Sequence, residues 1–252
     1  MTPLDIERVR RLLPGRRLAW FETLGSTMRE AARMARAGCP AGTAVVAEEQ
    51  TAGQGRHGHS WHSEPGAGLY VSVVLRLSLP PDSLPALTLA LGLATAEAIA
   101  RTCDFSADLR WPNDVVIDDR KVAGILVQLT DSVAIAGIGV NVNHAGFPPE
   151  LASQATSLAR AAGSTQSRED LLIALLPAID SFVKMLVEGG PRPVLDMFTS
   201  HSSYARGRRV RVQQPDCVLE GVTAGLNPSG FLILRADDGS ESLILAGGVR
   251  PA

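Results

Sequence analysis

Residues 50–75 read QTAGQGRHGHSWHSEPGAGLYVSVVL, and the elements around this stretch decide the class of fold. Gly53 to Gly58 matches the G-x-G-x-x-G pattern of dinucleotide-binding proteins. That pattern requires a strand, a tight loop and then a helix whose N-terminus meets the phosphates. Here β-branched, apolar segments lie on both sides of the loop, at residues 43–47 and 69–77. The sequence therefore predicts strand, loop and strand, which disfavours a dinucleotide-binding fold.

The segments that flank this loop predict alternating helices and strands, from their apolar spacing and from the residues that end them. The predicted helices cover residues 5–13, 26–37, 84–102, 168–188 and 194–202. The other predicted strands cover residues 17–22, 109–117 with an interruption at Pro112, 121–129 and 133–142. The apolar stretch 84–100 is the most membrane-like, but its length of only 17 residues, Glu97 and its small residues favour a buried helix over a membrane span.

The chain changes character near Tyr204. Residues 145–167 predict a connection with little regular structure, whereas the segment after Tyr204 alternates short β segments with Gly- and Asp-rich turns. We therefore expect a mixed α/β fold with two domains, a larger one at residues 1–203 and a small all-β one at residues 204–252.

Composition and charge exclude several classes of protein. The 252 residues are 45% hydrophobic and 20% charged, with a formal net charge of −2. A net charge of this size does not indicate a general nucleic-acid-binding protein. The arginines at positions 206, 208, 209 and 211 are clustered locally and predict one solvent-exposed face of a strand. Three distant cysteines argue against a disulfide framework, and the charged N-terminal residues contain no secretory signal. We expect a protein of the reduced cytoplasm, with neither membrane nor nucleic acid as a partner.

The glycine-rich loop carries groups that suit an anionic ligand. Its glycines let the backbone approach a ligand closely, Arg56 adds a permanent planar cation, and Trp61 can cover a flat ring. A flexible hairpin without a ligand is the alternative. His57, His59 and His62 suggest a metal site, but no carboxylate or cysteine lies at a convincing spacing beyond Glu64, so we expect solvated or ligand-edge histidines.

A second constellation joins RWPND at residues 110–114 to Lys121. A turn at Asp118 and Asp119 would fold Lys121 back towards Asn113 and Asp114. An amide, a carboxylate and an ammonium together can hold Mg²⁺ and an anionic oxygen. The alternative is a surface Asp–Lys pair across a hairpin, which contributes little.

A third constellation is GIGVNVN at residues 137–143. Alternating glycines on a strand leave room for a ligand against the backbone, and Asn141 can pair with the edge of a base. A tightly packed strand is the alternative. Near the N-terminus, Thr27 and Glu30 form a capping-box pattern, which predicts a helix start that can also contact a polar ligand.

Taken in order, these motifs closely resemble the biotin–protein ligase family from about residue 17 to residue 250. The matching segments are GSTM at 25–28, EEQTAGQGRHGHSW at 48–61, GLYVSVVL at 68–75, RWPND at 110–114, K-VAGIL at 121–126, GIGVNVN at 137–143 and ATSL at 155–158. The resemblance implies a mixed central sheet with flanking helices, as in class II synthetases, and a small C-terminal β-barrel of the Src-homology type. It also implies two steps: MgATP converts biotin to biotinyl-5′-adenylate and pyrophosphate, and a lysine of a biotin carboxyl carrier protein then accepts the biotin.

The resemblance also implies residue roles, position by position. Lys121 and Arg56 match the catalytic positions. The biotin-binding positions are Ser26, Thr27, Met28, Gln50, Gln54, Gly55, Arg56, Lys121, Gly124, Leu126, Gly137 and Gly139. The ATP-binding positions are Arg56, His57, Trp61, Asn113, Lys121 and Asn141, and Asp114 matches a Mg²⁺ position. The chain departs from the family at Met28, where asparagine is usual, and at Gln54, where arginine is usual.

Other functions remain open at this stage. The nearest alternative is a lipoate or octanoate ligase or transferase of a related fold, and an alternative of another class is a non-catalytic biotin or nucleotide sensor. A regulator that also ligates biotin is disfavoured, because about 16 residues before the first predicted strand are too few for a helix-turn-helix reader. The pattern is compatible with a monomer or a homodimer.

Overall fold

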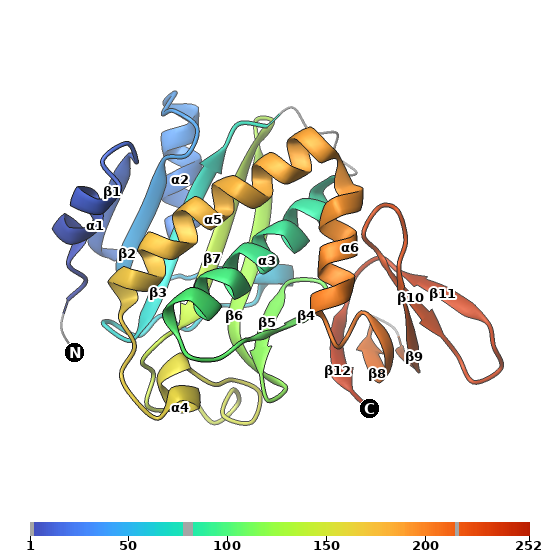
Figure 1. Cartoon of the computed structure of the whole chain (residues 1–252). Helices are drawn as coiled ribbons and strands as arrows, with labels where there is room; N and C mark the ends of the chain where they lie inside the picture. The colour runs from blue at the N-terminus through green and yellow to red at the C-terminus, as the bar shows by residue number, and fades with distance from the viewer. Residues whose placement is uncertain (1–2, 78–82, 215–216) are drawn as a thin grey trace.

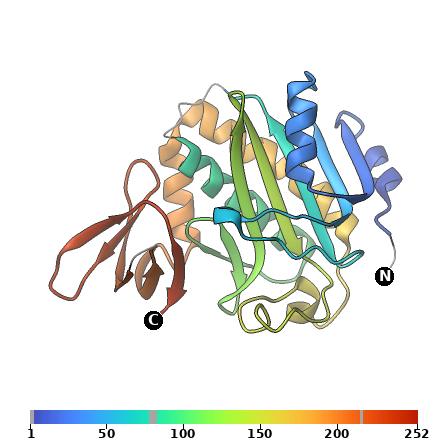
Figure 2. The ribbon, with the colours of Figure 1, turned by 180° about the vertical axis from the view of Figure 1, so that it is seen from behind.

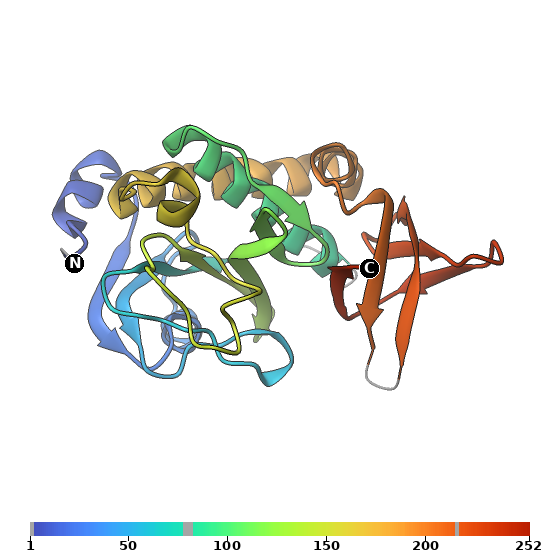
Figure 3. The ribbon, with the colours of Figure 1, turned by 90° about the horizontal axis from the view of Figure 1, so that it is seen from below.

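The computed structural model describes residues 3–77, 83–214 and 217–252. Two sheets organise these residues, one of seven strands in the order β1-β2-β3-β7-β6-β5-β4 and one of five in the order β11-β10-β9-β8-β12. The larger sheet is the centre of the molecule, and the smaller one forms a lobe at its side (Figures 1 and 3). The predicted mixed α/β fold is confirmed.

The seven strands of the large sheet come from the first 141 residues. They are β1 (Leu18–Leu24), β2 (Ala44–Gln50), β3 (Gly68–Leu75), β4 (Asp108–Arg110), β5 (Asp114–Ile117), β6 (Arg120–Thr130) and β7 (Val133–Asn141). Strand β1 pairs with β2 in parallel, and every other pairing in this sheet is antiparallel. All eight residues of β3 are buried, because helices and the glycine-rich loop cover both faces of the sheet.

The helices divide between the two faces. They are α1 (Ile6–Leu12), α2 (Thr27–Arg36), α3 (Leu84–Thr102), α4 (Leu158–Ala162), α5 (Arg168–Gly189) and α6 (Pro191–His201). Helices α3 and α5 pack on one face and on each other, whereas α2 and the glycine-rich loop lie on the other face (Figures 1 and 2). Successive strand residues alternate between two cores, so Val73 joins the α3–α5 core and Val74 the α2 core.

Helix α3 is long and apolar enough, by length and composition, to cross a membrane. In the structure it lies between the sheet and α5, and 61% of its most apolar window is buried. Its bounds, Leu84–Thr102, agree with the predicted ones. The interpretation of this stretch as a buried core helix is confirmed.

Two local predictions need correction. The predicted interruption at Pro112 is present, where proline has no N–H to continue a ladder, but the chain reverses there, so residues 109–117 belong to two antiparallel strands, β4 and β5. The capping box also fails. The residue before α2 is Ser26, whose side chain makes no capping bond, and Thr27 instead donates its hydroxyl to Gln50 Oε1 at 3.0 Å. The predicted turn at Asp118 and Asp119 is present, with both residues at positive φ.

The C-terminal lobe is entirely β, as expected. Its strands are β8 (Arg206–Gln213), β9 (Val218–Leu226), β10 (Leu232–Arg235), β11 (Glu241–Ile244) and β12 (Gly248–Pro251), and all pair antiparallel. Trp111 Nε1 donates to Gly230 O at 2.9 Å across the junction. Tyr204 is fully buried there, and its hydroxyl donates to Asp119 Oδ1 at 2.6 Å. The lobe is therefore fastened to the hairpin that carries RWPND.

A buried ion pair anchors the end of β2 that leads into the glycine-rich loop. Arg168 Nη1 lies 2.7 Å from Glu48 Oε1, and the Glu48 carboxylate also accepts from Leu4 N at 3.1 Å. Removal of one member of a buried ion pair is strongly destabilising. Glu48→Ala should therefore lower the free energy of unfolding by about 3–5 kcal/mol, measured by urea denaturation.

The neighbouring Glu49 provides the matched control. Its carboxylate accepts from Thr23 Oγ1 at an exposed site, so Glu49→Ala should cost less than about 1 kcal/mol. Equal losses in the two variants would contradict a special contribution of the Glu48–Arg168 pair.

Candidate active site

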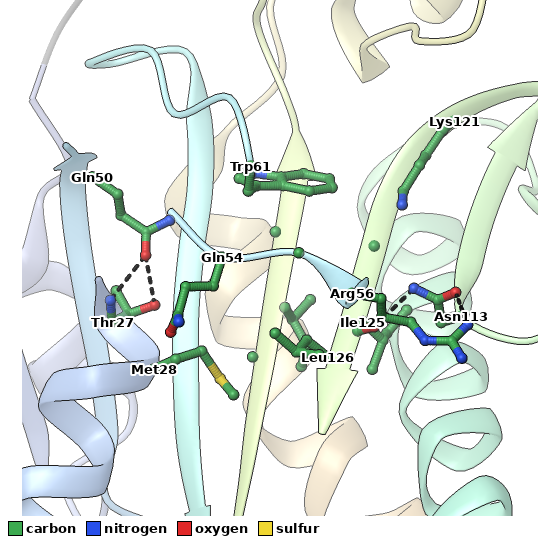
Figure 4. Close-up of a pocket in the computed structure, with 15 residues that line it drawn as sticks. Thr27, Met28, Gln50, Gln54, Arg56, Trp61, Asn113, Lys121, Ile125 and Leu126 are labelled. Carbon is green, nitrogen blue, oxygen red and sulfur yellow. Dashed lines mark hydrogen bonds between the residues drawn. The ribbon is translucent and has the colours of Figure 1, made fainter. Parts of the chain in front are cut away.

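A pocket, partly open to solvent, lies on the α2 face of the large sheet. Figure 4 shows its polar end at Thr27 and Gln50, its cationic end at Lys121 and Arg56, and Trp61 over the middle. The lining residues are Thr27, Met28, Gln50, Gln54, Gly55, Arg56, Trp61, Asn113, Lys121, Gly124, Ile125, Leu126, Gly137, Ile138 and Gly139. Segments far apart in the sequence thus converge on one site.

The polar end is a connected set of hydrogen bonds. Gln50 Oε1 accepts from both Thr27 N at 2.8 Å and Thr27 Oγ1 at 3.0 Å. Its Nε2 donates to Ser63 Oγ at 3.0 Å, and Ser72 Oγ donates to Thr27 Oγ1 at 2.8 Å. Donors and acceptors held in this way can pair with the edge of a cyclic amide or urea.

Three glycines of β6 and β7 form the wall between the ends. A Cβ at Gly139 would lie 2.4 Å from Trp61 Cε2, and one at Gly124 would lie 2.7 Å from Trp61 Cζ3. A Cβ at Gly137 would lie 2.5 Å from Met28 Sδ. The space expected for a ligand against the backbone therefore exists, and Trp61 and Met28 fill part of it here.

Charged groups gather at the other end. Lys121 Nζ lies 2.6 Å from Asp114 Oδ1 and 5.3 Å from the centre of the Trp61 ring. Arg56 Nη1 donates to Asn113 Oδ1 at 3.1 Å, and Asn113 Nδ2 donates to Ile125 O at 3.0 Å. Burial lowers the pKa of the Arg56 guanidinium, and the Asp114 charge opposes this shift. The predicted approach of Lys121 to Asp114 is confirmed.

The surroundings of Asp114 do not fit a metal ligand. Its Oδ1 is held by Lys121 and its Oδ2 by Arg110 Nη2 at 2.8 Å, with Arg250 Nη1 3.7 Å away. Burial raises the pKa of this carboxyl, but the Lys121 and Arg110 charges outweigh it and hold the pKa below its usual value. A carboxylate already shared by cations has no free oxygen for Mg²⁺, so we derive no step through a metal at Asp114.

The glycine-rich loop forms a hairpin over the pocket. Gly55 N donates to His59 O at 2.7 Å, and Trp61 N donates to Gly53 O at 3.0 Å. Ser26 Oγ donates to Gln54 Oε1 at 3.2 Å, which ties the loop to the start of α2. His57 stands at the tip with φ 54°, exposed and away from the pocket lining.

The structure does not bring every candidate into the pocket. Asn141 is buried, and its Nδ2 donates to Thr156 O at 3.1 Å and lies 3.4 Å from Lys121 O. Ser26 does not line the pocket, although its Oγ donates to Gln54 Oε1, and Asp114 lies behind Lys121. Sequence reasoning missed Ser72, whose position in the middle of an otherwise apolar strand could have identified it.

Comparisons with known protein families match both parts of the chain. Residues 20–144 match the model of the biotin/lipoate A/B protein ligase family, and residues 206–249 match the biotin protein ligase C-terminal domain. The bifunctional ligase/repressor BirA of Bacillus subtilis is 33% identical over 92% of this chain and 73% of its own length. The biotin–[acetyl-CoA-carboxylase] ligase of Mycobacterium tuberculosis is 30% identical over 98% of this chain and 94% of its own.

Comparison with solved structures gives the same result. The biotin protein ligase from Aquifex aeolicus, in complex with biotin and ATP, superposes with a TM-score of 0.83 and 31% identity. The match covers 94% of this chain and 99% of that one. The similarity thus extends over both sheets.

The depressed pKa of Asp114 has a consequence for stability. A carboxyl with a lowered folded-state pKa stabilises the fold above its unfolded value, about pH 4, and this contribution is lost as pH falls through the folded pKa. Asp114→Asn should therefore destabilise the protein strongly at about pH 6, by roughly 3–5 kcal/mol, and by roughly 1 kcal/mol less at about pH 3, because this contribution falls by about 1.4 kcal/mol for each pH unit below the unfolded pKa. Urea denaturation of both proteins at the two pH values measures this difference.

Asp196 is a suitable control, because its pairing with Arg192 at 3.7 Å is exposed. Asp196→Asn should change stability little at either pH. A pH-independent loss in Asp114→Asn would show that its charge is not what stabilises the fold.

Proposed function

This chain belongs to the biotin protein ligase family, and from that premise we propose that it activates biotin with MgATP and transfers it to a lysine of a carrier protein. In the first step, a biotin carboxylate oxygen bonds to the α-phosphorus as the bond to the pyrophosphate oxygen breaks. In the second, the lysine amine bonds to the biotin carbonyl carbon, AMP leaves and the amine loses a proton. The product is an amide, so the enzyme is a carbon–nitrogen ligase.

One observation carries this proposal: a single pocket has a neutral polar end and a cationic end, joined by a glycine wall. The neutral end, at Thr27 and Gln50, suits the ureido ring of biotin. The cationic end, at Lys121 and Arg56, suits the carboxylate and the α-phosphate. The two reacting groups would therefore meet at Lys121.

Lys121 is our candidate for stabilising the reacting oxygens. An ammonium has three donors, and one of them is committed to Asp114, which fixes the position of Nζ. The remaining donors can point at charge that develops on the α-phosphate, and a preorganised donor is effective because it needs no rearrangement. Asp114 is thus a positioning residue, and Mg²⁺ enters as part of the MgATP substrate.

Trp61 and Met28 define how the ligand enters. The Trp61 indole lies on Gly124 and Gly139, and its Nε1 is buried without a partner in the described part of the chain. A buried N–H without an acceptor costs about 1–3 kcal/mol, so displacement of the indole relieves a penalty. We propose that the ligand takes this place on the wall and that the indole then covers it, which keeps water from the reactive anhydride. Met28 offers a thioether contact where the family usually has an amide.

Several finer assignments belong to the same proposal. Residues 1–203 would be the catalytic domain and residues 204–252 a C-terminal domain that supports it through Arg250 and Tyr204. The acceptor would be the biotin carboxyl carrier protein of acetyl-CoA carboxylase or a related carboxylase, in the cytoplasm, and the ligase a monomer or a homodimer. Exchange assays with biotin and with lipoate, run in parallel, test the substrate choice against the lipoate alternative.

Lys121→Ala should lower biotin-dependent ATP–pyrophosphate exchange by roughly 10²–10³-fold, the usual effect of losing one preorganised donor. Lys184→Ala is the matched control, because Lys184 is exposed on α5, 3.9 Å from Glu188. Exchange in the control should equal that of the wild type. Near-normal exchange in Lys121→Ala would remove Lys121 from the mechanism.

Arg56→Gly should release biotinyl-adenylate and label proteins indiscriminately, because Arg56 ties the loop across the pocket to Asn113. The measurement is biotin incorporation into a carrier domain and into serum albumin in one reaction. Arg211→Gly, at an exposed pair with Glu220, should keep the wild-type preference. Strict carrier specificity in Arg56→Gly would argue that the loop does not retain the intermediate.

A further inference from the structure

Beside the pocket, three ligand-type side chains meet at the base of the glycine-rich loop. One ring nitrogen each of His62 and His144 and one carboxylate oxygen of Glu64 lie within 4.8 Å of one another. His62 and Glu64 precede β3, and His144 follows β7. The pairing of Gly68 with Asn141 in these neighbouring strands brings the two segments together.

His144 has one ring nitrogen for which the described residues provide no hydrogen-bond partner. Its ring is fully buried, and Nδ1 finds no hydrogen-bond partner within the residues that the structure describes. Tyr70 Oη donates its proton to Glu64 O at 3.0 Å, so at its 3.4 Å contact with His144 Nε2 it can only accept. Nε2 therefore carries the ring proton, and Nδ1 keeps a free lone pair inside the protein.

A neutral imidazole whose second nitrogen is held by an outer partner is the form in which histidine binds metals, and Tyr70 supplies that partner.

We propose that His62, Glu64 and His144 form a zinc-binding site. Two imidazoles and one carboxylate are an established ligand set for Zn²⁺, with water as the fourth ligand. In a tetrahedral site with bonds of about 2.0–2.1 Å the ligand atoms lie roughly 3.3 Å apart, so the widest separation here must contract by roughly 1.5 Å. His62 and Glu64 are only partly buried, which leaves them free to make this adjustment.

The ion would act on the loop. His62 directly follows Trp61, and His144 stacks on Phe147 in the segment after β7, with ring centroids 5.2 Å apart. Zinc would thus clamp the C-terminal arm of the glycine-rich loop to the body of the sheet. The inference concerns metal binding and does not rest on the proposed ligase activity.

The test is zinc binding by the whole chain. Protein stripped with EDTA is titrated with ZnCl₂ under reducing conditions, desalted, and measured for metal content and for the rate of trypsin cleavage at Arg56. We expect one zinc per chain, cleavage slowed by zinc, and no displacement by excess Mg²⁺, which prefers oxygen ligands. His62→Ala and Glu64→Gln should each weaken zinc binding by at least about tenfold.

Control variants distinguish zinc binding at this site from zinc binding by other side chains. His59→Ala, His201→Ala and Cys217→Ser each remove an exposed histidine or the exposed cysteine and should keep wild-type zinc binding. His62 is partly exposed, so its replacement tests the site without the folding risk of His144→Ala. The proposal is overturned if the wild type retains no zinc, or if binding survives His62→Ala and disappears in one of the controls.

Discussion

The buried carboxylate of Asp114 is the interaction on which the site depends. Its side chain is 11% exposed and bonds Lys121 at 2.6 Å and Arg110 at 2.8 Å. A charge in this position is tolerated only when cations compensate it, so the carboxylate and both cations must be present together. Because Arg110 lies on β4, Asp114 on β5 and Lys121 on β6, the attraction of the carboxylate for both cations also holds the three strands in register. Arg250, 3.7 Å from Asp114 Oδ2, extends this dependence to the C-terminal sheet.

Space in the pocket is controlled from outside the sheet. The strands contribute glycines at 124, 137 and 139, and the volume they leave is taken by Trp61 from the loop and Met28 from α2. If the strands carried large side chains at these positions, the space for a ligand could not open, because close-packed protein interiors do not give up a volume of that size. Side chains that reach in from a loop or a helix start can be exchanged for a ligand without disturbing the sheet. The rigid part of the site and its movable part are therefore built from different elements.

Much of the fold follows from the sequence, and the features that were predicted incorrectly have a common cause. Strand β3 and helix α3 are predicted well, because a continuous apolar run and a long helical stretch are local signals. The hairpin at Pro112 was missed because a proline marks an interruption without giving the direction in which the chain leaves it. Thr27 was assigned to a cap, because Gln50 and Ser72 compete for it only after α2 has packed on the sheet.

The same limit applies to the site. The approach of Lys121 to Asp114 could be inferred from a turn nearby in the sequence, but no local pattern connects His62 with His144. Asn141 was expected to contact a base, whereas its amide bonds the backbone of segments that the sequence could not place beside it. Contacts between residues on either side of one turn can be predicted from local rules. Contacts that arise because distant strands become neighbours in the sheet cannot.

The strength of the loop's attachment follows from the few bonds that hold it. Its side-chain anchors to the body include Gln54 to Ser26 and Arg56 to Asn113, at 3.2 and 3.1 Å. A neutral bond contributes about 0.5–1.5 kcal/mol and one to a charged group about 1.5–3 kcal/mol, so the Arg56 anchor is the larger of the two. Since Arg56 and Trp61 stand on opposite arms of one hairpin, opening withdraws the cation and the indole together. A loop with glutamine rather than a second arginine at position 54 thus depends on Arg56 for closure, and it opens at a cost far below that of disturbing the sheet beneath it.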